Sequence, residues 1–391
     1  MSRPVVFMAG GGTGGHVFPL LAVAQAIREL SPEVESIFIG TDRGIESRVV
    51  PAAGFRLELM ATLPFRGGGL KGASRGLLSV ARSLPRSRAL IKEYAPRAVC
   101  SVGGYAAVPI ALAARASGIP LALMEPNSTP GLANKLVGPV ARRVYTAFEH
   151  DSRFFPRSAQ LRTGVALRTG FSPSPYAWSG KGQPLRILVL GGSQGARSLN
   201  DIAAPALSRM KVPITIVHQV GKGNLLAMRQ RYAELRRPGA SVIEFIEDMP
   251  AAIAAADLVI SRAGASAIAE ICAVGRPSVL VPLPRSGDHQ LHNARALESA
   301  GGAICLNGKD QSTDGIAECL VQLAGDPERL AALAEKARAW GRPDAARAVA
   351  LDLLALAGLS EAAAPADAAP VDAVASPAVT AAPIGSGAER P

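Results

Sequence analysis

The sequence lacks any apolar run that approaches the roughly 18–20 residues of a membrane-spanning helix. Its N-terminus reads Met-Ser-Arg-Pro and passes directly into an apolar segment at 5–9, without the charged head, long apolar core and small-residue cleavage site of a secretory signal. The four cysteines are widely spaced and form no Cys-x-x-Cys pair, which favours reduced, buried thiols. These absences predict a protein of the cytoplasm.

Aromatic residues make up only 4% of the 391-residue chain, and the basic residues are not interleaved with them. A platform that stacks single-stranded nucleic acid needs that interleaving, so we expect no nucleic-acid partner. Acidic residues are outnumbered, 31 against 42 lysines and arginines, which leaves a formal charge of +11. Such a surplus indicates an anionic partner, and phosphate-bearing ligands or an acidic membrane surface remain as candidates.

Short apolar segments alternate with longer segments of helical periodicity, which predicts an α/β fold with parallel sheets. The length fits two domains. We expect an N-terminal domain at 1–169, a linker rich in glycine, proline and serine at 170–184, a C-terminal domain at 185–358, and a disordered tail of alanine and proline at 359–391. The expected strands lie at 5–9, 36–39, 98–101, 120–124 and 143–146, and then at 185–190, 214–219, 241–245, 258–261 and 278–282.

Each half opens with a buried strand that runs into a glycine cluster and then a helix, at 10–16 and at 191–195. Glycines at such a turn let the backbone approach a ligand, and the amide groups and helix dipole favour negative charge there. Gly10, Gly12 and Gly15 match G-x-G-x-x-G, so a nicotinamide-dependent dehydrogenase is an alternative. His16 at the end of the turn and a second glycine turn in a separate domain argue against it.

A third segment, 261–270, places a strand end and a tight turn before a helix that begins near Ala265 or Ser266. Glu270 then lies about one turn into that helix, where its carboxylate can accept hydrogen bonds from ribose hydroxyls. The alternative is that Glu270 only stabilises the helix N-terminus electrostatically. Farther on, 288–293 follows a strand and opens a helix with side chains that suit the hydroxyls of a sugar.

Several blocks together resemble the MurG family of peptidoglycan N-acetylglucosaminyltransferases, which convert lipid I to lipid II. The first is Gly-Gly-Thr-Gly-Gly-His-Val-Phe-Pro at 11–19, and the others occur in the family's order over roughly residues 3–345. Those others lie at 103–105, 125–127, 191–197, 244–249, 261–270 and 288–290. Blocks in order are far more specific than any one of them alone.

The resemblance implies a GT-B fold, in which two Rossmann-like domains face a cleft, with the donor UDP-N-acetylglucosamine held mainly by the C-terminal half. Ser193 is then expected at the diphosphate, the backbone of Ile246 at uracil, Glu270 at ribose and Gln290 at the sugar. The helix-end phosphate site comprises Gly264, Ala265, Ser266, Ala267, Ile268 and Ala269. Thr13, Gly14, Gly15 and Asn127 are expected at the sugar and acceptor side, and Arg168 neutralises donor phosphate.

Two positions depart from the family. Met124 stands where the family commonly has a histidine, and Val165-Ala166 stand where it has Asn-Pro shortly before the arginine that Arg168 matches. Any role of that histidine is therefore absent from this chain.

The implied reaction transfers N-acetylglucosamine to the 4-hydroxyl of the acceptor's muramic acid sugar with inversion, which needs a base and stabilisation of the departing UDP. His16 is our candidate base, because the helix dipole disfavours imidazolium there, and Glu125 is the competing candidate. Alternatively, His16 only shapes the turn. We expect neither a metal nor another cofactor, because no Asp-x-Asp motif lies outside the tail and His289 with His292 lacks a third ligand.

The segment 60–92 contains seven lysines or arginines and no acid, interspersed with leucines, valine and phenylalanine. Such a segment suits the acidic surface of the cytoplasmic leaflet of the bacterial inner membrane. The undecaprenyl-diphosphate-linked acceptor implied by the resemblance is anchored in that membrane. The alternative is a solvated basic loop followed by an ordinary amphipathic helix. Two other functions stay open: another GT-B nucleotide-sugar transferase with a lipid or small-molecule acceptor, and a non-catalytic basic binder of membranes or nucleic acid. The binder leaves 261–270 and Gln290 without a role.

Overall fold

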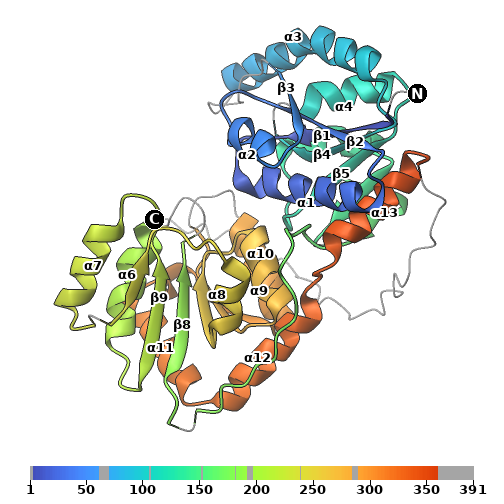
Figure 1. The fold of residues 1–391 in the computed structure, drawn as a ribbon. Coiled ribbons are helices and arrows are strands. Elements are labelled where there is room, and N and C mark those ends of the chain that lie inside the picture. The colour runs from blue at the N-terminus through green and yellow to red at the C-terminus, as the bar shows by residue number, and fades with distance from the viewer. Residues whose placement is uncertain are drawn as a thin grey trace, which may run out of the picture.

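The computed structural model describes residues 3–60, 70–104, 107–150, 153–180, 182–191, 197–237, 239–283 and 289–359, with the backbone alone at 70–77. Two α/β units follow one another along the chain, and the last helix returns to the first unit (Figure 1). The tail that we expect to be disordered lies outside the described residues from 360 onward. The four cysteines are buried and unpaired, as predicted.

The first unit contains a seven-stranded parallel sheet in the order β3-β2-β1-β4-β5-β6-β7. Its strands are β1 (Val5–Gly10), β2 (Glu35–Gly40), β3 (Arg56–Leu59), β4 (Ala98–Gly103), β5 (Leu121–Glu125), β6 (Arg143–Thr146) and β7 (Gln160–Arg162). Its helices are α1 (Gly14–Leu30), α2 (Glu46–Ala52), α3 (Leu70–Tyr94), α4 (Ala107–Ala116) and α5 (Leu132–Val137), with short 3₁₀ turns at Gly138–Val140 and Arg157–Ala159.

The sheet of the first unit is buried on both faces, because helices cover each side. Successive residues of β1 point to opposite faces. Helix α1 lies on one side of the sheet, and α3 and α4 lie on the other (Figure 1). Val6 and Met8 pack against α1, whereas Phe7 and Ala9 pack against α3 and α4. This arrangement explains why the strands read as continuous apolar runs rather than as alternating ones.

The second unit contains a six-stranded parallel sheet in the order β10-β9-β8-β11-β12-β13. Its strands are β8 (Leu185–Leu190), β9 (Ile214–Gln219), β10 (Ser241–Ile243), β11 (Leu258–Ser261), β12 (Ser278–Leu280) and β13 (Ala303–Cys305). Its helices are α6 (Arg197–Ser208), α7 (Leu225–Glu234), α8 (Met249–Ala255), α9 (Ala265–Val274), α10 (His289–Ser299), α11 (Thr313–Ala324) and α12 (Pro327–Trp340), with a 3₁₀ turn at Gly308–Asp310.

All ten expected strands are present, and four of them have the predicted bounds, namely β6, β8, β9 and β11. The strands β10 and β12 end two residues earlier than predicted, and β3, β7 and β13 were not predicted. The three missed strands are short, and each lies at the edge of its sheet. Because an edge strand has a neighbour on one side only, it needs no long apolar run, and its sequence signal is weak.

The final helix, α13 (Ala345–Leu356), belongs to the first unit, so the predicted end of the C-terminal domain at residue 358 is wrong. Val349 and Leu353 lie in the same buried cluster as the α1 side chains. Asp352 accepts a hydrogen bond of 2.8 Å from the Tyr145 hydroxyl and forms an ion pair with Arg143 at 3.2 Å. The C-terminal domain therefore ends near Trp340, at the end of α12.

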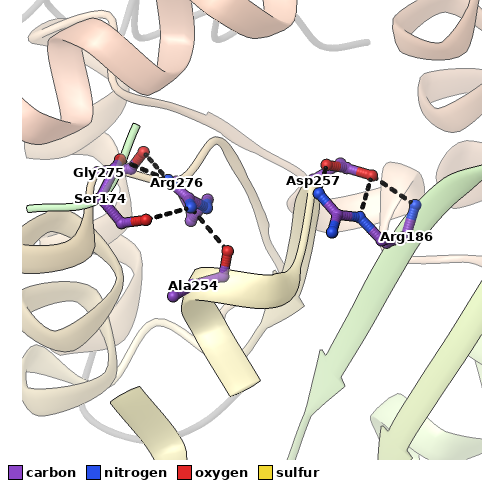
Figure 2. A network of polar contacts seen from close by, with 6 residues as sticks. All are labelled: Ser174, Arg186, Ala254, Asp257, Gly275 and Arg276. Atoms are coloured by element: carbon purple, nitrogen blue, oxygen red, sulfur yellow. Dashed lines mark hydrogen bonds and ion pairs between the residues drawn. The ribbon is translucent and has the colours of Figure 1, made fainter. Parts of the chain in front are cut away.

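The segment predicted as a linker lies against the second unit instead of spanning solvent as a free coil. Arg276 donates to the Ser174 carbonyl at 2.9 Å and to the Ser174 hydroxyl at 3.0 Å, and also to the carbonyl of Ala254 at 2.7 Å (Figure 2). Beside this network, Arg186 at the start of β8 forms a two-pronged contact with the buried carboxylate of Asp257. These bonds fix the point at which the chain enters the second sheet.

One polar contact joins the two units at the open edges of their sheets. Asn293 of α10, fully buried, accepts hydrogen bonds from the backbone amide and the hydroxyl of Ser128, each at 2.9 Å. Its side-chain amide donates to Asn127 and to the carbonyl of Ala263, both at 3.3 Å. A single side chain therefore links the turn after β5 in the first unit with the turn after β11 in the second.

Candidate active site

Both sheets reverse their strand order beside the strand that begins each unit. In the first sheet β1 lies between β2 and β4, and in the second β8 lies between β9 and β11. Open parallel sheets bind ligands outside the carboxyl ends of their strands at such reversal points. The two glycine turns predicted from the sequence begin at these two places, after Gly10 and after Leu190.

The turn at 10–16 leads from β1 into α1. Gly12 has a φ of 94°, a left-handed backbone conformation that favours glycine. Thr13 is extended at the helix N-terminus, makes no side-chain capping bond, and accepts the amide of His16 on its carbonyl. The amides of Gly14 and Gly15 belong to the first turn and have no acceptor within the helix, so they are available to an anionic group.

His16 is half-buried, and one of its ring nitrogens is engaged by the turn. Its Nδ1 lies 3.2 Å from the carbonyl oxygen of Gly11. A carbonyl oxygen can only accept, so the hydrogen bond requires the proton on Nδ1. The lone pair is then on Nε2, the nitrogen that a base needs to have free.

Glu125 is buried, and its two oxygens are occupied by its own loop. One oxygen accepts from the backbone amide of Asn127 at 3.1 Å and from its side chain at 3.4 Å. The other accepts from the amide of Gly131 and from the side chain of Asn134, each at 2.9 Å. Burial raises the pKa of Glu125, and these four hydrogen bonds act in the opposite direction. This carboxylate thereby fixes the turn that carries Asn127.

The helix-end segment lies where the sequence predicts it. Gly264 caps α9, and the helix begins at Ala265. Ala265, Ile268 and Ala269 are buried, whereas Ser266 and Ala267 are partly exposed. Because Gly264 has no side chain, the amides of the first turn of α9 can approach an anion closely.

Glu270 is half-buried on α9, and burial raises its pKa to about 7. The positive charge of Arg168 opposes that shift. Arg168 is exposed, and its guanidinium lies 5.8 Å from the centre of the Phe171 ring. The structure therefore brings together Arg168 and Glu270, two predicted donor residues that are about 100 positions apart.

The remaining predicted residues of the C-terminal half surround the same sheet edge. Gln290 is half-buried in the first turn of α10 and accepts the amide of Leu283 at 2.9 Å. Ile246 is buried, and the side chain of the neighbouring Phe245 is 61% exposed, a large apolar surface for a residue beside a binding turn. Ser193 lies outside the described residues.

Three polar residues at the strand ends were given no individual role by the sequence: Glu46 in the first unit, and Arg262 and Asn293 in the second. Arg262 is buried and donates to the carbonyls of Val281 and Pro282, at 2.8 and 3.3 Å, and to the hydroxyl of Ser198. Arg262 thus joins the ends of β11 and β12 to α6. Asn293 is the last residue of the segment 288–293, whose side chains were predicted to suit a sugar, but its contact with the first unit was not predicted.

Within the described parts of the chain, no three histidine, cysteine, aspartate or glutamate side chains gather in a way that could hold a metal ion. The positive groups near the predicted diphosphate position are instead Arg168 and the amide groups at the start of α9. Binding of the donor without a metal remains a prediction.

Comparison with known proteins identifies both halves of the chain. Residues 6–146 match the glycosyltransferase family 28 N-terminal domain, and residues 186–349 match the glycosyltransferase family 28 C-terminal domain. A UDP-N-acetylglucosamine–N-acetylmuramyl-(pentapeptide) pyrophosphoryl-undecaprenol N-acetylglucosamine transferase of Sorangium cellulosum is 46% identical, with 90% of this chain and 88% of the relative covered. The enzyme of the same name from Syntrophotalea carbinolica is 40% identical over 87% of this chain and 96% of its own.

The fold matches as well. The crystal structure of Acinetobacter baumannii MurG superposes with a TM-score of 0.75 at 30% sequence identity, covering 90% of this chain and 99% of that one. The GT-B fold predicted from the motif blocks is therefore confirmed. The chain belongs to glycosyltransferase family 28 and, within it, to the MurG family of N-acetylglucosaminyltransferases.

Proposed function

We propose that this chain transfers N-acetylglucosamine from UDP-N-acetylglucosamine to the 4-hydroxyl of the muramic acid sugar of undecaprenyl-diphosphate-linked N-acetylmuramyl-pentapeptide. This step converts lipid I to lipid II in peptidoglycan synthesis, with inversion at the anomeric carbon. Family membership supports the two substrates. One observation carries the proposal: Asn293 connects the strand ends of the two units. It contacts the Asn127–Ser128 turn of the first unit and the Ala263 carbonyl of the second.

Incubation of the purified chain with UDP-N-acetylglucosamine and a lipid I analogue is expected to release UDP and to form the disaccharide product in equal amounts. Mass spectrometry of the product and a coupled UDP assay measure the two. Transfer to a diacylglycerol but not to the lipid I analogue would favour the other kind of GT-B transferase. Absence of transfer to either acceptor, together with binding to acidic vesicles, would favour a non-catalytic membrane binder.

The donor occupies the C-terminal half in this proposal. Within the predicted segment from Gly264 to Ala269, the amides of Ala265, Ser266 and Ala267 have no acceptor in the helix and face the diphosphate, together with the guanidinium of Arg168 and with Ser193. Glu270 accepts the ribose hydroxyls, the backbone of Ile246 reads uracil and Gln290 binds the sugar. The diphosphate is the leaving group, so the same positive groups stabilise the charge that develops on UDP as the sugar departs.

Donor affinity is expected to depend on pH through Glu270. Its pKa is raised to about 7, and ribose hydroxyls donate to the ionised carboxylate. Protonation below pH 7 therefore competes with binding, and at pH 6 affinity is expected to be about tenfold lower than at pH 8. Calorimetric titration with UDP-N-acetylglucosamine, whose diphosphate diester does not titrate in this range, measures the effect.

Two variants serve as controls for this pH dependence. Glu270→Gln is expected to bind the donor weakly at every pH without the fall below pH 7. Arg168→Ala removes the charge that lowers the pKa of Glu270, so the fall is expected to begin at higher pH. If donor affinity of the wild type is constant from pH 6 to 8, Glu270 is not the ribose ligand.

His16 is the proposed base. Its Nε2 takes the proton of the acceptor hydroxyl while the hydroxyl oxygen attacks the anomeric carbon and the bond to UDP breaks. Glu125 is the weaker candidate, because the oxygens of its carboxylate are engaged by Asn127, Gly131 and Asn134. The amides of Gly14 and Gly15, together with Thr13, are left to bind the acceptor's diphosphate, and Asn127 lies on the sugar side.

Replacement of His16 separates catalysis from shaping of the turn. In His16→Asn the side-chain NH₂ occupies the place of Nδ1 and can still donate to the Gly11 carbonyl, but no base remains. We expect both His16→Asn and His16→Ala to lower kcat by about 100-fold or more, with little change in the KM for the donor. If His16→Asn kept near-normal kcat under saturating substrates, His16 would only shape the turn.

Peripheral association with the cytoplasmic leaflet of the bacterial inner membrane is part of the proposal. None of the helices in the described part of the chain is both long and apolar enough to span a bilayer. The predicted segment 60–92 is described from 70 onward as α3, and the side chains of 61–77 lie outside the described residues. α3 packs against α4, and α4 packs against α5. Exposed leucines occur on all three helices, namely Leu78, Leu112, Leu132 and Leu136.

An apolar surface beside exposed cations suits an acidic lipid surface. Arg82, Arg88 and Lys92 of α3 are exposed. Co-sedimentation with vesicles is expected to be strong for anionic lipid and to weaken as salt rises. Leu132→Ser with Leu136→Ser is expected to reduce binding, whereas Val321→Ser, an exposed apolar position on α11 of the other unit, is not. Equal binding to neutral vesicles at high salt would contradict the electrostatic part.

A further inference from the structure

Glu46, the first residue of α2, is a fully buried carboxylate directly beneath the glycine turn. One of its oxygens accepts the amide of Gly12 at 2.8 Å. The other accepts the amide of Thr41 at 3.0 Å and the hydroxyl of Thr41 at 2.8 Å. Burial of a carboxylate is costly unless hydrogen bonds replace its water, and these three bonds do so. Neither the sequence motifs nor the proposed reaction assigns Glu46 a role.

Glycines around Glu46 leave the space for its carboxylate. A Cβ atom at Gly11 or at Gly44 would overlap the carboxylate oxygens, and one at Gly40 would lie 2.7 Å from Cγ of Glu46. Gly11 directly follows β1, Gly40 is the last residue of β2, and Gly44 lies between β2 and α2. The ends of both strands therefore leave room for the carboxylate of Glu46. The backbone is therefore shaped around this side chain, which holds one fixed position.

The peptide group between Gly11 and Gly12 makes hydrogen bonds at both ends. Its N–H donates to Glu46 at 2.8 Å, and its carbonyl oxygen accepts from Nδ1 of His16 at 3.2 Å. The backbone of Gly104 lies on the other side of this peptide, where a Cβ would be 3.3 Å from the Gly11 oxygen. A continuous chain of hydrogen bonds thus runs from a buried carboxylate through one peptide group to the proposed base.

We propose that Glu46 is a positioning residue that acts on His16 through the Gly11–Gly12 peptide. The negative charge at the N–H end polarises the peptide and makes its carbonyl oxygen a stronger acceptor. That acceptor holds the His16 proton on Nδ1, orients the ring and stabilises the imidazolium formed when Nε2 takes the acceptor's proton. In catalytic triads a carboxylate performs this task by direct contact with histidine.

This inference rests on the proposed role of His16 as base. The proton from the acceptor hydroxyl goes to Nε2 and stays there until it is released to solvent, and Glu46 remains unprotonated. The hydroxyl oxygen forms the new bond to the anomeric carbon, and UDP leaves with the electrons of the bond that breaks. A purely structural Glu46 would fix the turn without affecting the tautomer of His16.

Glu46→Gln tests the proposal, because glutamine has the same shape but only one acceptor oxygen. With that oxygen directed to the two donors of Thr41, its NH₂ group faces the N–H of Gly12, and the link to the peptide is lost. We expect kcat to fall about 10- to 100-fold, the range that a hydrogen bond to a charged group supports, with the donor KM within twofold of wild type.

Nitrogen-15 NMR of the imidazole ring provides a readout that a structural role would not change. We expect wild-type His16 to be the Nδ1–H tautomer, and His16 of Glu46→Gln to be a mixture of both neutral tautomers. Asp352→Asn is the matched control, since it converts another carboxylate of the same unit, bonded to Tyr145 and Arg143, to an amide. It is expected to lower Tm without changing the His16 tautomer or kcat.

A double variant separates this inference from the proposed base. If Glu46 acts through His16, adding Glu46→Gln to His16→Ala causes no further loss of kcat. A wild-type Nε2–H tautomer, normal kcat in Glu46→Gln, or a full additional loss in the double variant each overturns the role of Glu46. Normal kcat in His16→Ala overturns the base instead. Should Glu46→Gln fail to fold, a wild-type Nε2–H tautomer still overturns the role of Glu46.

Discussion

Parallel pairing of the strands is the constraint on which the rest of the structure depends. All the strand pairs of both sheets are parallel, so the carboxyl ends of the strands of a unit open at one edge. Residues far apart in sequence meet there: a Cβ added to Gly104 would lie 3.3 Å from the Gly11 oxygen, and Asn293 of α10 contacts the turn after β5. The two glycine turns start at these edges, and so do the turns that carry Glu125 and Arg262, because parallel strands all end on the same side of a sheet.

The chain crosses twice between the units, once through the segment that precedes β8 and once between α12 and α13. A cavity of about 410 Å³ lies beside both crossings, lined among others by Gln25, Phe171 and Pro343. The polar part of the contact at the strand ends consists of a few hydrogen bonds from Asn293, each worth about 1 kcal/mol. An apolar part lies beside it, where Phe148 of the first unit packs against Trp340 and the buried cluster of the second unit. The two units are therefore joined by two crossings of the chain, an apolar cluster and a few hydrogen bonds at the strand ends.

The sequence predicted the strands of the interior of each sheet and the location of the glycine turns after β1 and β8, for different reasons. Central strands such as β8 and β11 are apolar on both faces, so their signal is strong, and a glycine cluster directly after such a strand is typical of an anion-binding turn. The return of α13 to the first unit was missed because an amphipathic helix specifies an apolar face, not the domain that covers it. The contact of Asn293 with the first unit and the proposed role of Glu46 were missed because each depends on partners in other segments, which local patterns do not record.

Glu46 and Glu125, two buried carboxylates of the first unit, illustrate the same limit. Their different hydrogen bonds explain how the glycine turn can perform two tasks in the proposed reaction. In the proposed function, the turn binds an anionic diphosphate at the start of α1, yet it also carries a histidine that becomes positive during catalysis. The positive end of α1 opposes the charge gained by His16. Glu125 cannot offset this charge through the turn, because its hydrogen bonds are directed to its own loop. Glu46 can, because the Gly11–Gly12 peptide carries its influence to Nδ1 while the carboxylate stays buried beneath the turn and out of the anion's way.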